Sequence, residues 1–155
     1  MNFGPGAMLF LNGLRTNAGD LRRRVRAKAA ETRAAVGLAN KRASIVLYQW
    51  VLRNFQEEGA LSGGWEPLAP STIAYKQEQG YSRMLQNTGA LRASFLPYSD
   101  KDVALVGSPL SYSAAHEEGT SRVPQRRLLP TAEQAQALVL PIYGREMKVV
   151  TGRPL

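Results

Sequence analysis

Hydrophobic residues recur with a helical period along the first third of the chain. The apolar positions lie three, four or seven residues apart, on one side of a helix: Leu21, Val25, Ala29, Val36, Ala39, Ala43, Val46 and Trp50. Asp20 or Asn17 can cap the start of this helix, and Glu57-Glu58-Gly59 marks its end. The pattern predicts a long helix over residues 20–58, preceded by an N-terminal arm at residues 1–19.

The two halves of this helix differ in hydrophobicity. The apolar stripe is thin and rich in alanine at first, whereas residues 45–55 are apolar on several faces, so only the second half is expected in the core. Gly37 lies near the junction and costs about 1 kcal/mol relative to alanine in a helix, which predicts a bend there. A helix over residues 20–58 would be about 58 Å long. Its first half is therefore expected to project beyond the domain onto a neighbour.

Three shorter helices are predicted in the middle of the chain. Ser71 is expected to cap a helix that fades at Gly80, and Thr88 to cap a short turn through Leu91. Residues 112–119 form a third helix, which Gly119 ends. In the loop before these helices, Trp65 is expected to pack down and act as an anchor.

The segment at residues 95–106 alternates as a β-hairpin, with residues 99–102 as its turn. Phe95, Pro97, Val103 and Leu105 are the expected buried positions. Because Pro97 cannot donate a ladder hydrogen bond, it indicates an edge strand or a bulge. An exposed edge would offer a docking site for another subunit.

The C-terminal region is expected to begin with a helix capped by Thr131. Pro141 and Gly144 interrupt its pattern, which leaves a kinked helix and a helix followed by a strand as alternatives, and residues 151–155 are expected to form a loose tail. The chain of 155 residues is long enough for one core. We therefore expect a single α+β domain in which the long helix packs on a small antiparallel sheet with additional short helices. Residues 59–130 would form its core and residues 131–155 a C-terminal segment.

The net charge of +8 is confined to one segment. Residues 15–53 contain ten basic residues against Asp20 and Glu31, and the remainder of the chain is balanced. Arg22, Arg23, Arg24 and Arg26 cannot share one helix face, so base-specific reading of DNA is disfavoured. A solvated helix face, contact with an acidic partner and sequence-blind contact with DNA all fit this pattern.

Known catalytic patterns are missing from the sequence. The chain has no cysteine and one histidine, His116, which disfavours thiolate chemistry and a multi-histidine metal site. Its glycines are not followed by Gly-Lys-Ser/Thr, so a phosphate-binding loop is excluded. Asp100 and Asp102 fit a hairpin turn better than a pair of catalytic carboxylates. We expect no enzyme activity, no cofactor and no metal, and in residues 1–13 neither a signal peptide nor a membrane span.

An ordered set of residues resembles the phage virion morphogenesis and tail-completion family. The set runs from residue 65 to residue 128: Trp65-x-Pro-Leu, Thr72, Lys76, Leu85-x-x-Thr-Gly-x-Leu-Arg-x-Ser, Val106-Gly107, Tyr112-Ser-Ala-Ala-His116-x-x-Gly119 and Pro124-x-Arg126-x-Leu128. The resemblance covers roughly residues 40–130. It implies a structural protein of the virion neck or tail top, assembled in the host cytoplasm, with no known catalytic residues.

The resemblance also implies partners. They would be further copies in a ring of six or twelve, the head connector above, and tail tube or terminator proteins below. The expected assembly surface comprises Arg22, Arg23, Arg24, Arg26, Trp65, Arg126 and Arg127. The rival hypotheses are a DNA-binding accessory protein that uses the basic helix and, third, a virion-associated hydrolase.

Overall fold

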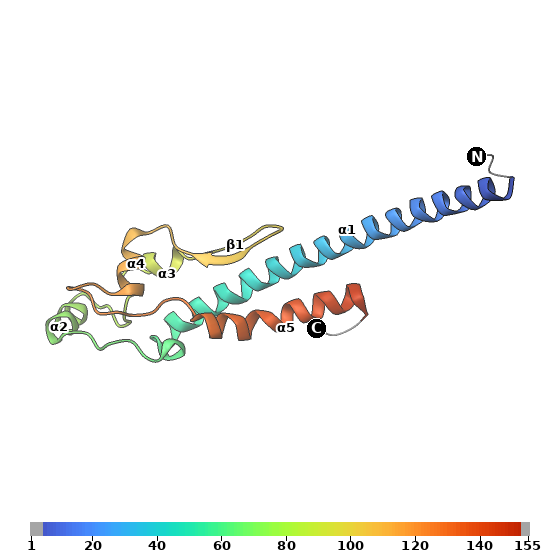
Figure 1. The fold of residues 1–155 in the computed structure, drawn as a ribbon. Helices are drawn as coiled ribbons and strands as arrows, with labels where there is room; N and C mark the ends of the chain where they lie inside the picture. The colour runs from blue at the N-terminus through green and yellow to red at the C-terminus, as the bar shows by residue number, and fades with distance from the viewer. Residues whose placement is uncertain (1–4, 153–155) are drawn as a thin grey trace.

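The structure is a computed structural model that describes the backbone of residues 5–152 and the side chains of residues 18–152. Its α+β architecture confirms the predicted fold class: one long helix carries a two-stranded antiparallel sheet and several shorter helices (Figure 1). The elements, in chain order, are α1 (Pro5–Gln56), a 3-10 turn η1 (Ala60–Ser62), α2 (Pro70–Glu78), α3 (Ala90–Ala93), β1 (Leu96–Ser99), β2 (Ala104–Gly107), α4 (Ser111–Glu118) and α5 (Ala132–Thr151). None of the helices in the described part of the chain has the length and hydrophobicity that a bilayer crossing requires.

Helix α1 is longer than predicted. It begins at Pro5, so the expected arm at residues 5–19 is helical and neither Asn17 nor Asp20 is a cap; residues 1–4 lie outside the described residues. Proline suits a first helical turn because its missing N–H has no partner there in any case. At 52 residues the helix is about 78 Å long.

The predicted bend at Gly37 is also wrong, since α1 continues through this residue as one straight helix (Figure 1). The cost of a single glycine is about 1 kcal/mol, which hydrogen bonds and packing on both sides offset. The helix ends two residues before Glu58. There Glu58 and Gly59 adopt the left-handed region, with φ of 50° and 89°, and turn the chain back.

The second half of α1 supplies one face of the core, as predicted. Buried residues recur every four positions along it: Ala39, Ala43, Leu47, Val51 and Phe55. Phe55 lies at the centre, with its ring 5.4 Å from that of Trp65 and 5.8 Å from that of Phe95. Leu91 and Leu128 complete this cluster. Burial of each large side chain is worth about 1.5–3 kcal/mol, so this cluster anchors the chain segments that follow α1.

The hairpin lies along α1, but its turn and the buried positions of its second strand differ from the prediction. Tyr98 pairs with Leu105 and Pro97 with Val106, across a four-residue turn at residues 100–103. This register turns Pro97 and Val106 toward α1 and leaves Tyr98 and Leu105 exposed. Phe95 is buried as expected, whereas Val103 and Leu105 are not. A shift of one residue at the turn exchanges the two faces of a strand, which explains the error.

Helix α5 packs against α1 (Figure 1). Thr131 caps it, as predicted, and forms a reciprocal capping box with Gln134. Of the two alternatives, the structure has the helix, which continues through Pro141 and Gly144, and not the helix followed by a strand. Contrary to prediction, Thr151 belongs to this helix and not to a loose tail. Proline inside a helix costs about 3 kcal/mol. Contacts with α1 beyond Pro141 offset this cost: Tyr143 donates to Asn40, and Glu146 pairs with Arg42. Residues 153–155 of the predicted tail lie outside the described residues.

The three short helices are present, although two caps differ from those predicted. Ala69 is the N-cap of α2, with Pro70 at the first helical position, so Ser71 is not the cap. Gly89 caps α3, and Thr88 stands one residue earlier, where its hydroxyl accepts from the N–H of Ala90. Gly119, with φ of 77°, ends α4 as predicted.

Candidate assembly surface

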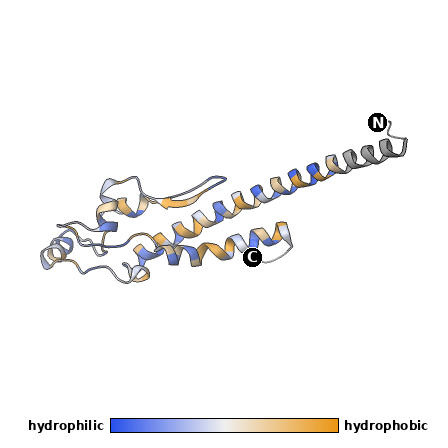
Figure 2. Cartoon of the chain, viewed as in Figure 1, coloured by the Kyte–Doolittle hydropathy of each residue, from blue (hydrophilic) through white to orange (hydrophobic). Residues whose placement is uncertain are grey.

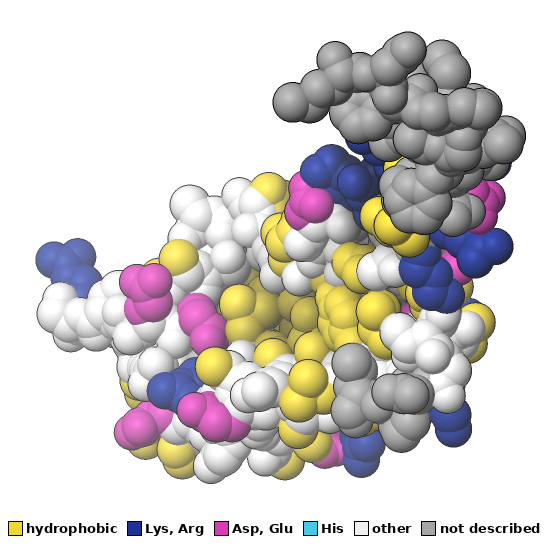
Figure 3. All heavy atoms as spheres, turned by 45° about the vertical axis from the view of Figure 1, so that its right-hand side comes forward, with side chains coloured by type: hydrophobic (Ala, Val, Ile, Leu, Met, Phe, Trp, Pro, Cys, Tyr) yellow, Lys and Arg dark blue, Asp and Glu magenta, His cyan; other side chains and the backbone are white. Residues whose placement is uncertain are grey.

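The N-terminal part of α1 extends past both α5 and the hairpin (Figure 1). We call residues 18–27 the basic extension. Figure 3 shows Lys and Arg side chains gathered on this part of the molecule, beside a hollow where hydrophobic side chains are exposed. All four predicted arginines lie on it and are exposed: Arg22, Arg23, Arg24 and Arg26. The structure thus brings these four together on a part of α1 that the domain does not cover.

The four arginines differ in their local partners. Arg23 and Arg24 form ion pairs with Asp20, at 3.4 Å and 3.0 Å. Both pairs are largely exposed and contribute little stability. Among the described side chains, no carboxylate pairs with Arg22 or Arg26, which lie four residues apart on one helix face. These two guanidinium groups remain available to an outside partner.

The basic extension also carries hydrophobic residues, which Figure 2 colours orange between blue hydrophilic ones. Leu21 and Val25 are 62% and 59% exposed. At 3.6 residues per turn, Val25 and the buried Ala43 are five full turns apart and point the same way. The core-facing stripe of α1 therefore continues beyond its own domain, where nothing in the described part of the chain covers it.

A second uncovered apolar surface is the outer face of the hairpin. Its three members alternate along the paired strands: Leu96, Tyr98 and Leu105 are 61%, 53% and 43% exposed. A two-stranded sheet with its outer face in water lacks the second layer that normally buries such side chains. This face is a candidate for contact with another chain.

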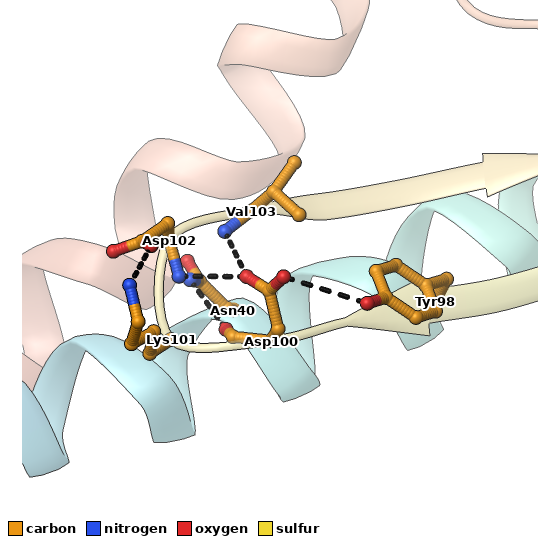
Figure 4. A network of polar contacts seen from close by, with 6 residues as sticks. All are labelled: Asn40, Tyr98, Asp100, Lys101, Asp102 and Val103. Atoms are coloured by element: carbon orange, nitrogen blue, oxygen red, sulfur yellow. Dashed lines mark hydrogen bonds and ion pairs between the residues drawn. The ribbon is translucent and has the colours of Figure 1, made fainter.

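The tip of the hairpin is fixed and carries two carboxylates (Figure 4). Asp100 accepts hydrogen bonds from the backbone N–H groups of Asp102 and Val103, at 2.8 Å and 2.9 Å, and these bonds hold its pKa below the ordinary value. Asp102 pairs with Lys101. The tip therefore keeps negative charge beside the exposed apolar face.

Trp65 and Arg126, which the sequence placed on the assembly surface, lie inside the monomer. The Trp65 indole packs against Phe55 and its Nε1 donates to the backbone oxygen of Arg127 over 2.8 Å. Arg126 donates from Nε and Nη2 to the carbonyl oxygens of Glu66 and Pro67. Their burial satisfies loop backbone groups and fills the core, which removes both from the surface. Arg127 is exposed and remains a candidate.

A cleft of about 770 Å³, lined by α2, α3 and α4 and by the loop at residues 122–126, was not predicted as a site. Lys76, His116 and Arg126 line it. Burial, and secondarily the charge of Arg126, hold the pKa of His116 below its ordinary value. The signal in the sequence was the ordered motif itself, because many of its members converge here. Across residues 18–152, no three His, Asp or Glu side chains lie close enough together to hold a metal ion.

Residues 46–148 match the model of the phage virion morphogenesis family. The chain belongs to this family. The match begins in the second half of α1 and ends within α5, so it covers the core, the hairpin and the cleft, whereas the basic extension precedes it. No curated protein and no solved structure matches the chain. Family membership places the chain among phage structural and assembly proteins, associated with the virion.

Proposed function

We propose that this member of the phage virion morphogenesis family is a neck or tail-completion protein, which forms a ring and joins the head connector to the tail. Family membership supports a role in building the particle. The observation that carries the more specific proposal is the basic extension. A helix about 78 Å long that leaves the domain with an exposed apolar stripe needs a surface on another molecule.

The outer face of the hairpin is the surface that best complements the basic extension. Leu21 and Val25 of one subunit would pack on Tyr98 and Leu105 of the next, since all four are exposed in the monomer. Arg22 and Arg26, on the same segment, would meet the carboxylates at the hairpin tip. Because the two surfaces differ, the contact is head-to-tail, and its repetition closes a ring when the rotation between neighbouring subunits divides a full turn.

A DNA-binding accessory role is the second candidate. It rests on Arg22 and Arg26, whose charges no carboxylate neutralises within the described side chains. Four arginines spread around a helix favour phosphate contact without sequence preference. Nanomolar affinity for one particular DNA sequence at physiological salt would favour this role over the structural one.

Electron microscopy of the purified protein and of virions tests the proposed function. We expect rings of the protein alone, or density for it at the neck. The subunit contact is tested separately by a double-cysteine variant, Leu21→Cys with Leu105→Cys, which is feasible because the natural chain has no cysteine. Under oxidation this variant should give a ladder of oligomers that ends at the closed ring.

The matched control pairs Leu21→Cys with Ile73→Cys, whose side chain is exposed on α2 away from the hairpin. This control should give no ladder. Rings without a ladder from the first pair would contradict the proposed contact alone. The absence of both rings and neck density would contradict the proposed function itself.

A further inference from the structure

The cleft between α2, α3 and α4 lies at the end of the molecule opposite the basic extension (Figure 1). We call it the cationic cleft. Polar and basic members of the sequence motif converge on it: Thr72, Lys76, Thr88, Tyr112, His116 and Arg126. Residues that are distant in the sequence thus form one concave surface.

Two buried cations face this cleft without a carboxylate partner. Lys76 is 6% exposed; its Nζ donates to Oδ1 of Asn87 and lies 5.5 Å from the centre of the Tyr81 ring. Arg126 is 6% exposed and donates only to backbone carbonyl oxygens. Neither forms an ion pair within the described residues. A buried charge is costly unless an opposite charge accompanies it, so a ligand anion would complete the site.

His116 also lines the cleft and carries an unused polar atom. Its Nδ1 is buried and has no hydrogen-bond partner among the described residues. Neutral imidazole carries one donor nitrogen and one acceptor nitrogen, and protonated imidazole carries two donors. An anion in the cleft would accept a hydrogen bond from His116 and favour its protonated form.

The rest of the lining decides what kind of anion fits. Leu68, Leu85 and Val123 form apolar walls, and Glu66 is the only carboxylate among the lining residues. A duplex phosphate backbone is convex and fully hydrated, whereas a peptide can place one acidic side chain among apolar ones within about 770 Å³. We propose that the cationic cleft binds a glutamate or aspartate side chain, flanked by apolar residues, from a neighbouring protein of the virion. The identity of that neighbour as a neck component rests on the proposed function.

The single histidine of the chain gives a direct test. The imidazole C–H signals of His116 can be followed by proton NMR while a short peptide of alternating leucine and glutamate is added. We expect a saturable shift of these signals and a rise in the pKa of His116. The same peptide with glutamine in place of glutamate should cause neither change.

Two variants locate the binding. Lys76→Gln should weaken binding of the glutamate peptide about tenfold or more, since it removes one of the two buried cations. Lys41→Gln removes the same charge from an exposed position on α1 and should leave binding unchanged. If Lys76→Gln does not fold by circular dichroism, the comparison of the two peptides on the natural chain decides the question.

The outcomes separate this inference from the proposed function. Three results would each overturn the inference about the cationic cleft. They are equal responses of His116 to the two peptides, no response to either peptide, and unchanged peptide affinity in a folded Lys76→Gln variant. A duplex oligonucleotide that shifts the His116 signals more strongly at the same salt would overturn it in favour of a phosphate ligand. Rings or neck density in the absence of peptide binding would refute the cleft alone. Peptide binding without rings or neck density would refute only the ring.

Discussion

Nδ2 of Asn40, in the middle of α1, donates a hydrogen bond to the backbone oxygen of Asp100 at the hairpin tip over 2.9 Å (Figure 4). Oδ1 of the same side chain accepts from the Tyr143 hydroxyl of α5. Asn40 is fully buried and thus joins the three main parts of the fold, α1, α5 and the hairpin. This junction fixes the acidic tip relative to the helices.

We expect Asn40→Ala to destabilise the protein by about 1–3 kcal/mol, because it removes the two hydrogen bonds of a buried side chain, each worth about 0.5–1.5 kcal/mol. Tyr143→Phe is the matched control, since it removes only one of the two hydrogen bonds and should cost less. Urea unfolding followed by circular dichroism measures both. Equal midpoints for Asn40→Ala and the natural protein would contradict the role of Asn40 as a junction.

Gly59 is expected to tolerate no side chain. A Cβ at this position would lie 2.3 Å from the Trp65 ring, and its φ of 89° also disfavours other residues. Gly63 has φ of 95° but nothing within 4 Å of the corresponding position, so it shares the backbone conformation without the clash. Gly59→Ala should therefore lower the melting temperature more than Gly63→Ala. Equal losses in a thermal unfolding experiment would show that Trp65 can move aside.

Elements whose signals lie within a few residues could be predicted from the sequence. Elements whose structure depends on contacts between distant residues could not. The capping box at Thr131 and the terminal Gly119 lie within a few residues of the backbone groups they satisfy, and both predictions are confirmed. At Pro141 the sequence left a kinked helix and a helix followed by a strand as alternatives, because the cost of the proline is local, whereas the contact between Tyr143 and Asn40 that offsets it spans 103 residues.

The same distinction between local signals and distant contacts applies to the candidate site. The exposure of the arginines of the basic extension could be predicted from the sequence, because a helix that leaves its domain exposes the side chains it carries. Trp65 was predicted to pack down, which the structure confirms, but it was also placed on the assembly surface together with Arg126. Both side chains are buried in the monomer, where they bond backbone carbonyl groups that are distant in the sequence. The cationic cleft was missed for a related reason: Lys76 and His116 are 40 residues apart in the sequence and become neighbours only in the folded chain.

Folding stability should fall as the pH drops from neutrality through the folded-state pKa of His116. Burial holds its pKa in the folded state below the ordinary value of 6.5. The unfolded chain therefore binds more protons as the pH falls, and stability that is complete above pH 6.5 is lost as the pH drops through the folded pKa. His116→Gln should be nearly independent of pH over this range. Urea midpoints that fall equally in both proteins would assign the dependence to other groups.

Charge reversal of the basic extension tests whether it is an assembly surface. We expect the combined variant Arg22→Glu, Arg23→Glu, Arg24→Glu and Arg26→Glu to fold normally, because all four side chains are exposed and glutamate is as good a helix former as arginine. The lost pairs with Asp20 are exposed and worth about 0–1 kcal/mol. Each substitution removes two positive charges, so the net charge falls from +8 to 0 (8 − 4 × 2).

The basic extension would meet the acidic hairpin tip of a neighbour, an acidic rim of another ring or DNA in the lumen. In each case charge reversal turns attraction into repulsion, so heads and tails should accumulate unjoined. A complementation assay that counts unjoined heads and tails by electron microscopy measures this, with circular dichroism to confirm folding. The control reverses exposed charges outside α1, at Arg83, Arg145 and Lys148, and should yield joined particles. Normal infectious particles from the fourfold variant would mean that the arginines form only a solvated face of α1 and are not an assembly surface. The contact between subunits would then have to rest on Leu21 and Val25 alone.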